Sequence, residues 1–260
     1  MTTSVLQDKL LFPFIAPPNG GKGTQTKILT DKYGLPTFDM GATFRQIRQN
    51  EPESELAKEL QSFMDRGALV PTETVTKVFS KGMTDLAAGS PSVKGFILDG
   101  FPRNAEQAEA LMQKCAEWKA RIAKVIYLNV PHDVIVERAS GRRMCSQNDH
   151  RVYNVNFPEQ MPKRQKIVNG EVQTDQFGKT VWLCDEDGSD LYIRKDDLPE
   201  NVENRLKVYA EETSPILEFF RSKGLLVEIK GDSGLANVTR DIENSILPDL
   251  QYAVSSVKKK

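Results

Sequence analysis

The segment FIAPPNGGKGTQ, residues 14–25, contains the residue types that bind phosphate. Glycines surround a lysine just before a helical pattern, and in such loops the backbone N–H groups and the lysine surround phosphate oxygens. The segment departs from the usual loop, because Ala16 replaces the first glycine and Gly23 replaces the hydroxyl residue, which follows as Thr24. Asn19 tolerates a left-handed backbone, and Ala16 costs about 1 kcal/mol only if it needs positive φ. We therefore predict a functional phosphate-binding loop.

The elements around this loop alternate between short apolar strands and amphipathic helices, which indicates a parallel sheet covered on both faces. Strands are predicted at 10–15, 95–99, 124–130 and 225–229. Helices are predicted at 22–33, 104–122, 131–140, 199–223 and 234–246. Pro13 is unusual within the first strand, because proline cannot donate a ladder hydrogen bond. Between 141 and 197 the alternation stops, and prolines and glycines separate short alternating stretches that indicate a β-rich insertion.

The composition is that of a globular protein, with 39% hydrophobic and 27% charged residues among 260. A formal net charge of −1 argues against nucleic acid as a partner, since binding to a phosphate backbone usually needs a basic surface. The chain has neither an apolar run of roughly 18 residues nor a start typical of a targeting peptide, so no membrane association is expected. Three cysteines do not form a disulfide framework, and we expect a cytoplasmic protein.

Five blocks along the chain together resemble one family, the adenylate kinases of the long-lid type, within the nucleoside monophosphate (NMP) kinases. The blocks are GKGTQ (21–25), MGATFRQ (40–46), FILDGFPRNAEQ (96–107), VERASGRR (136–143) and YIRKDDLPENVENRL (192–206). The resemblance implies an α/β fold like that of P-loop NTPases, with a parallel five-stranded sheet flanked by helices. It also implies three parts: a core (1–38, 76–140 and 198–260), a small helical NMP-binding segment (39–75) and an inserted β-rich lid (141–197).

The implied reaction is the Mg²⁺-dependent, reversible transfer of a phosphoryl group from ATP to AMP, which gives two ADP. The acceptor is a phosphate oxygen that is already ionised at neutral pH, so the reaction needs no general base. Neutralisation of charge and in-line alignment carry such catalysis, which calls for several arginines. The chain is expected to act as a monomer on these nucleotides.

The resemblance assigns a role to each matching residue. The residues implied in catalysis are Lys22, Arg103, Arg142, Arg194 and Arg205. Those implied in binding ATP are Asn19, Gly20, Gly21, Lys22, Gly23, Thr24, Arg138, Arg142, Val152 and Tyr153. Those implied in binding AMP are Met40, Arg45, Ala68, Leu69, Val70, Gly100, Phe101, Pro102, Arg103, Gln107, Arg194 and Arg205. Asp99 is implied in orienting Mg²⁺ through its waters.

The acceptor site also contains departures from the family pattern. Gln107 stands where adenylate kinases have a glutamine that contacts adenine, which favours AMP. Met40 replaces a small hydroxyl residue, and its thioether is a poor hydrogen-bonding group. Ala42 replaces an aspartate of the motif. Two alternatives therefore stay open: a catalytically weakened nucleotide sensor, and a kinase with relaxed specificity that accepts UMP or CMP.

The lid has the positions at which some relatives bind structural zinc and others have a polar network. These positions are Cys145, Asn148, Cys184 and Asp187. Two thiolates and a carboxylate suit zinc with His150 or water as the fourth ligand, but asparagine is a poor ligand. A polar network without metal and a Cys145–Cys184 disulfide are the other options.

Overall fold

A computed structural model describes residues 5–65, 68–147, 152–175 and 178–257. The chain divides into two compact units: unit 1 consists of Met1–Pro131 and Arg205–Lys260, and unit 2 of His132–Asn204. Each unit has its own cluster of buried apolar side chains. The expected division into core, NMP-binding segment and lid is finer than this and stays a prediction. No helix among the described residues is long and apolar enough to cross a membrane.

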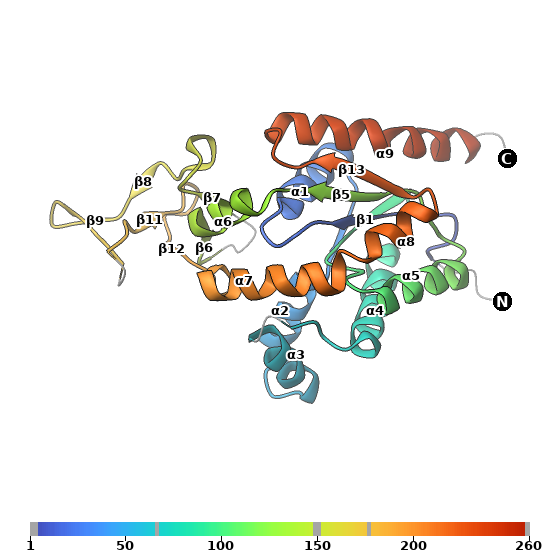
Figure 1. The fold of residues 1–260 in the computed structure, drawn as a ribbon, viewed down its shortest axis with the longest axis horizontal. Helices are drawn as coiled ribbons and strands as arrows, with labels where there is room; N and C mark the ends of the chain where they lie inside the picture. Colours follow the sequence, from blue (N-terminus) through green and yellow to red (C-terminus); the bar gives the residue numbers. More distant parts are fainter. Residues whose placement is uncertain (1–4, 66–67, 148–151, 176–177, 258–260) are drawn as a thin grey trace. The chain divides into compact units, whose positions relative to one another are not determined.

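The predicted parallel sheet forms the centre of unit 1 (Figure 1). Its strands are β1 (Leu10–Ile15), β2 (Thr37–Asp39), β3 (Gly95–Asp99), β5 (Val125–Asn129) and β13 (Leu226–Lys230), in the order β13-β5-β1-β3-β2. A short strand, β4 (Arg121–Ile122), also pairs with β1. β2 was not predicted, because a strand of three residues is too short to show a periodic pattern.

Pro13 is accommodated in the central strand by a local interruption of the sheet. On one side β1 pairs continuously with β3, including Pro13 with Leu98. On the other side, β4 pairs with β1 at Leu10 and Leu11, and β5 pairs with it only from Phe14 onward. The amide of Ala123 donates to the carbonyl of Leu11, so the backbone of Leu11 faces β4 and β5. Pro13, two residues later, faces the same side, and its missing N–H is therefore absent from this edge of β1.

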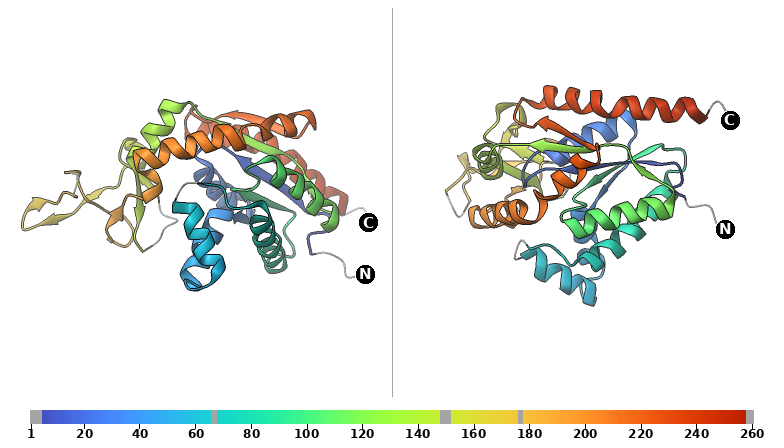
Figure 2. Two further views of the ribbon diagram at one scale, coloured as in Figure 1. Left: turned by 60° about the horizontal axis from the view of Figure 1, so that its bottom comes forward. Right: turned by 45° about the vertical axis from the view of Figure 1, so that its right-hand side comes forward.

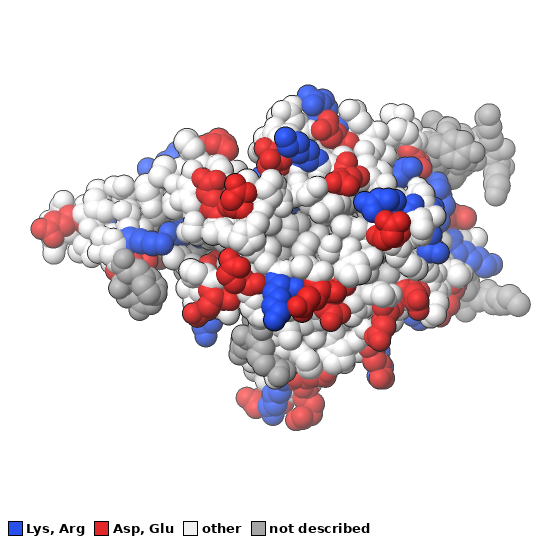
Figure 3. All heavy atoms as spheres, viewed as in Figure 1, with Lys and Arg blue, Asp and Glu red and all other residues white. Residues whose placement is uncertain are grey.

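The helices of unit 1 cover both faces of the sheet, as predicted (Figures 1 and 2). Helices α1 and α9 lie together on one face, and α4, α5 and α8 on the other. Their bounds are α1 (Lys22–Tyr33), α2 (Met40–Asn50), α3 (Glu55–Asp65), α4 (Thr72–Gly89), α5 (Ala105–Trp118), α8 (Ile216–Ser222) and α9 (Leu235–Val257). On the face drawn in Figure 3, acidic and basic side chains are interspersed, in line with the near-zero net charge.

Three of the predicted helices have different bounds in the structure. The helix predicted at 104–122 ends at Trp118, because Lys119 adopts a left-handed conformation (φ 55°) that closes it before β4. The helix predicted at 199–223 is divided into α7 (Pro199–Val208), a π-helical turn (Tyr209–Thr213) and α8, with Pro215, which has no N–H, between the last two. The last helix continues beyond residue 246, through Pro248, to Val257.

Unit 2 contains the predicted antiparallel strands. The largest sheet has the order β12-β6-β7, formed by β12 (Leu191–Tyr192), β6 (Arg142–Cys145) and β7 (Val152–Asn154). Two smaller pairs are β8 (Arg164–Gln165) with β11 (Trp182–Leu183), and β9 (Ile167–Val168) with β10 (Glu171–Val172). The unit begins with α6 (His132–Gly141), and α7 begins in it and ends in unit 1. It also contains two 3₁₀ turns, Pro158–Gln160 and Lys195–Asp197.

Candidate active site

The predicted phosphate-binding loop connects β1 with α1 at the carboxyl end of the sheet. Among the described non-glycine residues, positive φ occurs at Asp8, Asn19 (57°), Lys119 and Asn169. Ala16 is not one of them, so its substitution for glycine causes no such strain. Gly21 caps α1 in a left-handed conformation (φ 89°). A Cβ on Gly20 would lie 2.8 Å from the Cβ of Ala16 and 2.9 Å from the carbonyl oxygen of Pro17, so this position requires glycine.

Lys22 occupies the centre of a group of charges in unit 1. Its Nζ donates to the carbonyl oxygen of Ala16 at 3.2 Å. Burial lowers the pKa of Lys22, the nearby Arg103 and Arg205 lower it further, and the carboxylates of Asp99 and Asp39 oppose the decrease. A half-buried lysine among arginines leaves a local excess of positive charge, which phosphate oxygens would neutralise.

Asp99 is the acidic member of this group at the end of β3. Burial raises the pKa of Asp99 to about 6; Lys22 counteracts this shift, and Asp39 adds to it. Asp39 ends β2 and is paired with Asp99 in the parallel register. Two carboxylates at the carboxyl ends of neighbouring strands, beside a phosphate loop, are hard oxygen ligands of the type that Mg²⁺ prefers.

An open cavity lies beside these charges, and all of its lining residues belong to unit 1. The predicted residues Lys22, Leu69, Gly100, Pro102, Arg103 and Arg205 line it, together with Ala16, Tyr209 and Thr213. The side chain of Arg103 is held by its Nε, which donates to the carbonyl oxygen of Gly100 at 3.1 Å. The Thr213 hydroxyl donates to the backbone carbonyl of Arg103 at 2.7 Å. The structure thus brings three of the predicted cationic residues to one cavity.

Other predicted residues of unit 1 do not line this cavity. Met40, Val70, Phe101 and Gln107 are buried. The Gln107 side chain accepts a hydrogen bond from the amide of Arg103 at 2.8 Å, which fixes the orientation of its amide group. Arg45 lies beside a second hollow, within the segment 39–75 that is predicted to bind NMP, with Arg48 and Lys58. Ala68, Gly23 and Thr24 are exposed.

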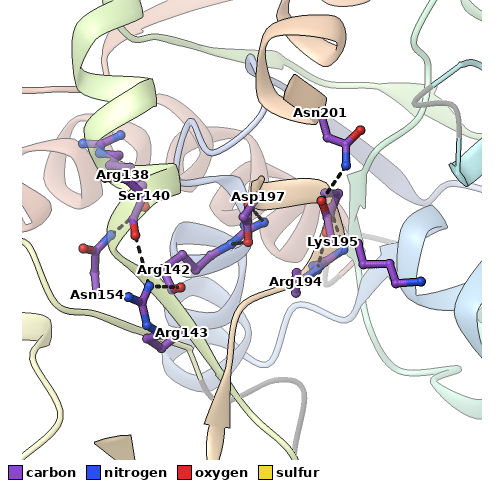
Figure 4. A network of polar contacts seen from close by, with 10 residues as sticks. Arg138, Ser140, Arg142, Arg143, Asn154, Arg194, Lys195, Asp197 and Asn201 are labelled. Atoms are coloured by element: carbon purple, nitrogen blue, oxygen red, sulfur yellow. Dashed lines mark hydrogen bonds and ion pairs between the residues drawn. The ribbon is translucent and has the colours of Figure 1, made fainter. Parts of the chain in front are cut away.

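Two of the predicted arginines of unit 2, Arg142 and Arg194, are paired with carboxylates in the structure (Figure 4). Arg142 donates through Nε and Nη2 to both oxygens of Asp197, at 2.7 and 2.5 Å. Arg194 makes the same type of pair with Asp196, at 2.8 and 2.9 Å. Asn154 donates to the backbone carbonyl of Arg138. Among the residues that the structure describes, neither of these two guanidinium groups uses its Nη1 in a hydrogen bond, so each Nη1 can donate to another acceptor.

Two further predicted residues lie on β7. The Val152 side chain is exposed, whereas Tyr153 is buried in the small core of unit 2. The Tyr153 hydroxyl accepts a hydrogen bond from the amide of Asp185 and lies 3.5 Å from Sγ of Cys184. The phenol of Tyr153 therefore belongs to the hydrophobic core of unit 2. If this residue contacts a nucleotide, the contact would be made by its backbone.

The cysteines of unit 2 are free buried thiols. Among the described residues, Cys145, Cys184 and Asp187 have their potential ligand atoms within 4.8 Å of one another. The Cys145 thiol also donates to Asp187 at 3.3 Å and lies 3.1 Å from the hydroxyl of Ser189. Asn148 and His150 lie outside the described residues. Three possible ligands with hydrogen bonds among themselves suit both zinc and a polar network, so both stay predictions.

Sequence reasoning missed Asp39, Asp197 and Thr213 as residues of the sites. Asp39 directly precedes an amphipathic helix, and an aspartate at this place is the signal of an N-cap. Its side chain does accept from the amide of Ala42 at 2.9 Å. Asp197 lies in the block YIRKDDLPENVENRL, in which the family resemblance assigns roles only to the arginines. Thr213 lies in the π-helical turn and had no signal in the sequence.

Comparisons with known proteins agree with the geometry. A profile of the family described as adenylate kinase matches residues 14–225. Adenylate kinase of Staphylococcus aureus strain Mu50 is 38% identical over 228 residues, which are 86% of this chain and 93% of the relative. Adenylate kinase of Staphylococcus epidermidis is 37% identical over the same shares of the two chains. The match thus includes the phosphate loop, the cavity and the arginines of unit 2.

Proposed function

Since the chain belongs to the adenylate kinase family, and is therefore a nucleoside monophosphate kinase, we propose that it catalyses Mg²⁺-dependent, reversible phosphoryl transfer from ATP to AMP. The observation that carries this proposal is the cavity of unit 1, in which Lys22, Arg103 and Arg205 meet at the carboxyl end of the sheet. ATP, AMP and ADP are its proposed ligands.

The residues of unit 1 are proposed to bind the phosphates of both nucleotides and to neutralise their negative charge. Lys22 and the backbone of 19–24 bind the phosphates of ATP, and α1 directs its positive N-terminal end toward them. Arg45 and Arg103 bind the phosphate of AMP, for which a planar guanidinium offers paired donors. Because Lys22, Arg103 and Arg205 are held close together before substrate enters, little reorganisation is needed when negative charge develops.

The arginines of unit 2 are proposed to act on the transferring phosphoryl group, and this role rests on the family resemblance. Asp197 and Asp196 hold Arg142 and Arg194 through Nε and Nη2, so both guanidinium groups are already oriented. Arg138, on α6, is proposed to stack on the adenine of ATP. Closure of the lid would exclude water and strengthen these contacts.

The acceptor base is proposed to be adenine. The amide of Arg103 donates to the Gln107 carbonyl oxygen, so the NH₂ group of Gln107 is the part that remains to donate. Adenine N1 is an acceptor, whereas the corresponding nitrogens of guanine and uracil carry protons. The buried thioether of Met40 adds apolar contact without a further hydrogen bond. Cytosine also has an acceptor at this ring position, which makes CMP the strongest competitor.

Mg²⁺ is the proposed cofactor, and the residues present fit it. Asp99 offers carboxylate oxygens beside Lys22. Burial raises the pKa of Asp99 because it disfavours the ionised form, and a divalent cation would stabilise that form. When bound, Mg²⁺ neutralises charge on the nucleotide phosphates. Asp99 is expected to orient its waters, as the resemblance implies. Structural zinc at Cys145, Cys184 and Asp187 remains an alternative to the polar network.

The test is formation of ADP from Mg²⁺–ATP and AMP, with UMP, CMP and GMP in parallel and Lys22→Met as the control. Turnover with AMP that the Lys22→Met variant loses by at least about 100-fold would support the proposal. Equal turnover with CMP or UMP would support the relaxed-specificity alternative. Tight binding of ATP or AMP without turnover in any reaction would support the sensor.

A further inference from the structure

The second carboxylate at the end of the sheet, Asp39, has no role in the function proposed above. Asp39 is the last residue of β2 and Asp99 the last of β3, and the two are register partners in a parallel pair. Strands in a sheet lie about 4.8 Å apart, and paired residues direct their side chains to the same face. Because β1 is paired with β3 at Phe14 and Asp99, the same edge continues into the phosphate loop.

The charges around Asp39 are those of the active site. The carboxylate of Asp39 lies close enough to interact electrostatically with both Lys22, which is proposed to bind phosphate, and Asp99, which is proposed to orient Mg²⁺. A Cβ on Gly41 would lie 3.3 Å from both Oδ1 of Asp39 and Nη1 of Arg45, so this carboxylate and Arg45 lie on the same side of the turn.

One oxygen of Asp39 already has a partner. Oδ1 accepts the amide of Ala42 at 2.9 Å and so caps α2, which fixes the carboxylate. No other hydrogen bond or ion pair of this side chain is found among the residues that the structure describes. The second oxygen is therefore available to accept a hydrogen bond from a water molecule.

Ala42 occupies the position at which the family motif carries an aspartate, so the motif carboxylate is absent from α2. On the premise of the proposed kinase function, we infer that Asp39 takes its place and, together with Asp99, orients the water shell of Mg²⁺. This carboxylate stands three residues before the motif position, at the end of β2 and not in the first turn of α2. Mg²⁺ keeps several waters and needs only one or two carboxylates, so this site would satisfy it.

The alternative is that Asp39 serves only as a helix cap. Asparagine caps helices about as well as aspartate but carries no charge, so Asp39→Asn separates the two roles. Asp39→Ser is a second variant that also keeps a capping oxygen. Ala42→Asp in the Asp39→Asn background returns a carboxylate to the position of the family motif and tests for rescue.

The experiment measures binding of Mn²⁺, as a spectroscopic substitute for Mg²⁺, to the complex of the full chain with a non-hydrolysable ATP analogue. We expect Asp39→Asn and Asp39→Ser to raise the Kd for Mn²⁺ about tenfold, as loss of an outer-shell group does, without lowering the melting temperature. Affinity for the analogue without metal should not fall, and Ala42→Asp should restore most of the metal affinity.

An unchanged Kd for Mn²⁺ in both Asp39 variants, with a raised Kd in Asp99→Asn, would overturn the inference and leave Asp39 as a cap. This result is distinct from failure of the proposed function, which would appear as an absence of phosphoryl transfer in the unaltered chain. A raised Kd without rescue by Ala42→Asp would still support Asp39, because the effect follows its charge and not its cap.

Discussion

Arg142 and Asp197 form a bidentate ion pair in unit 2, in which the carboxylate side chain has no exposed surface and the arginine side chain is 20% exposed. A buried ion pair contributes little net stability, but loss of one partner leaves the other desolvated and unpaired. Asp197 therefore acts as the residue that holds Arg142 in place. The pair links the start of β6 to the turn before α7, two segments far apart in the sequence.

Asp197→Ala is expected to destabilise unit 2 by about 3 kcal/mol and to lower kcat more than it raises KM for ATP. The matched control is Asp196→Ala, because the carboxylate of Asp196 is 28% exposed and its pair with Arg194 is less buried. Urea denaturation and steady-state kinetics on both variants would measure the two effects. Equal losses of stability in the two variants would contradict the expectation that Asp197 matters more because its ion pair is more deeply buried.

Asn19 is the one non-glycine residue of the phosphate loop with a left-handed backbone in the described structure (φ 57°). Its amide nitrogen and oxygen are buried and have no hydrogen-bond partner there. Asn19→Gly should therefore match or exceed the natural stability, whereas Asn19→Ala should be about 1 kcal/mol less stable than Asn19→Gly. Chemical denaturation without nucleotide checks this order. A less stable glycine variant would mean that the amide has a structural role.

The fold was predictable where an apolar run or a turn residue marks an element. The strands β1, β3 and β5 follow from short apolar runs, and α1 follows from its place between the glycine-rich loop and Gly34, which closes it. Other elements became strands only because a neighbouring strand pairs with them, and such pairing cannot be seen in the sequence. Arg121–Ile122 continues the pattern of α5, but Lys119 closes the helix and these residues pair with β1 instead. The three residues of β2 form a strand only because β3 lies beside them.

The candidate site was predictable to the extent that the residues carry family motifs. Lys22, Arg103 and Arg205 line one cavity, although they are far apart in the sequence. The supporting residues were not predictable, because their roles arise from tertiary contacts. Thr213 reaches Arg103 across the fold, and the buried Tyr153 has a place in the core of unit 2 that its position in the sequence does not show.

Gly20 is expected to be the least replaceable glycine of the loop. A Cβ there would lie 2.8 Å from Ala16 and 2.9 Å from a backbone oxygen, and backbone cannot move aside as a side chain can. Gly20→Ala should cost about 2 kcal/mol of stability. Gly23→Ala is the control, because that position on α1 has nothing within 4 Å and alanine favours helix. The unfolding free energies of the two variants test whether Gly20→Ala is the more destabilising change. Equal values would contradict the prediction and show that the loop can shift to accommodate a Cβ at Gly20.

The raised pKa of Asp99 predicts a pH-dependent cost in stability. Burial first, and the neighbouring Asp39 second, raise the pKa of Asp99 from 3.8 to about 6, against the opposing effect of Lys22. The folded chain therefore binds this proton more tightly than the unfolded chain does. Ionisation of Asp99 lowers stability as the pH rises from about 4 to about 6, and the cost is constant above that range.

Asp99→Asn has no such ionisation, so its stability relative to the natural chain should rise by about 2 kcal/mol between pH 4 and pH 7. Urea denaturation without nucleotide or metal, at both pH values, measures this difference. Glu106→Gln, at an exposed carboxylate in the first turn of α5, is a matched control that should show no comparable gain. A difference between Asp99→Asn and the natural chain that does not change with pH would contradict the assignment. In that case Asp99 would be ionised in the folded chain throughout this range, and its charge would already be balanced by Lys22.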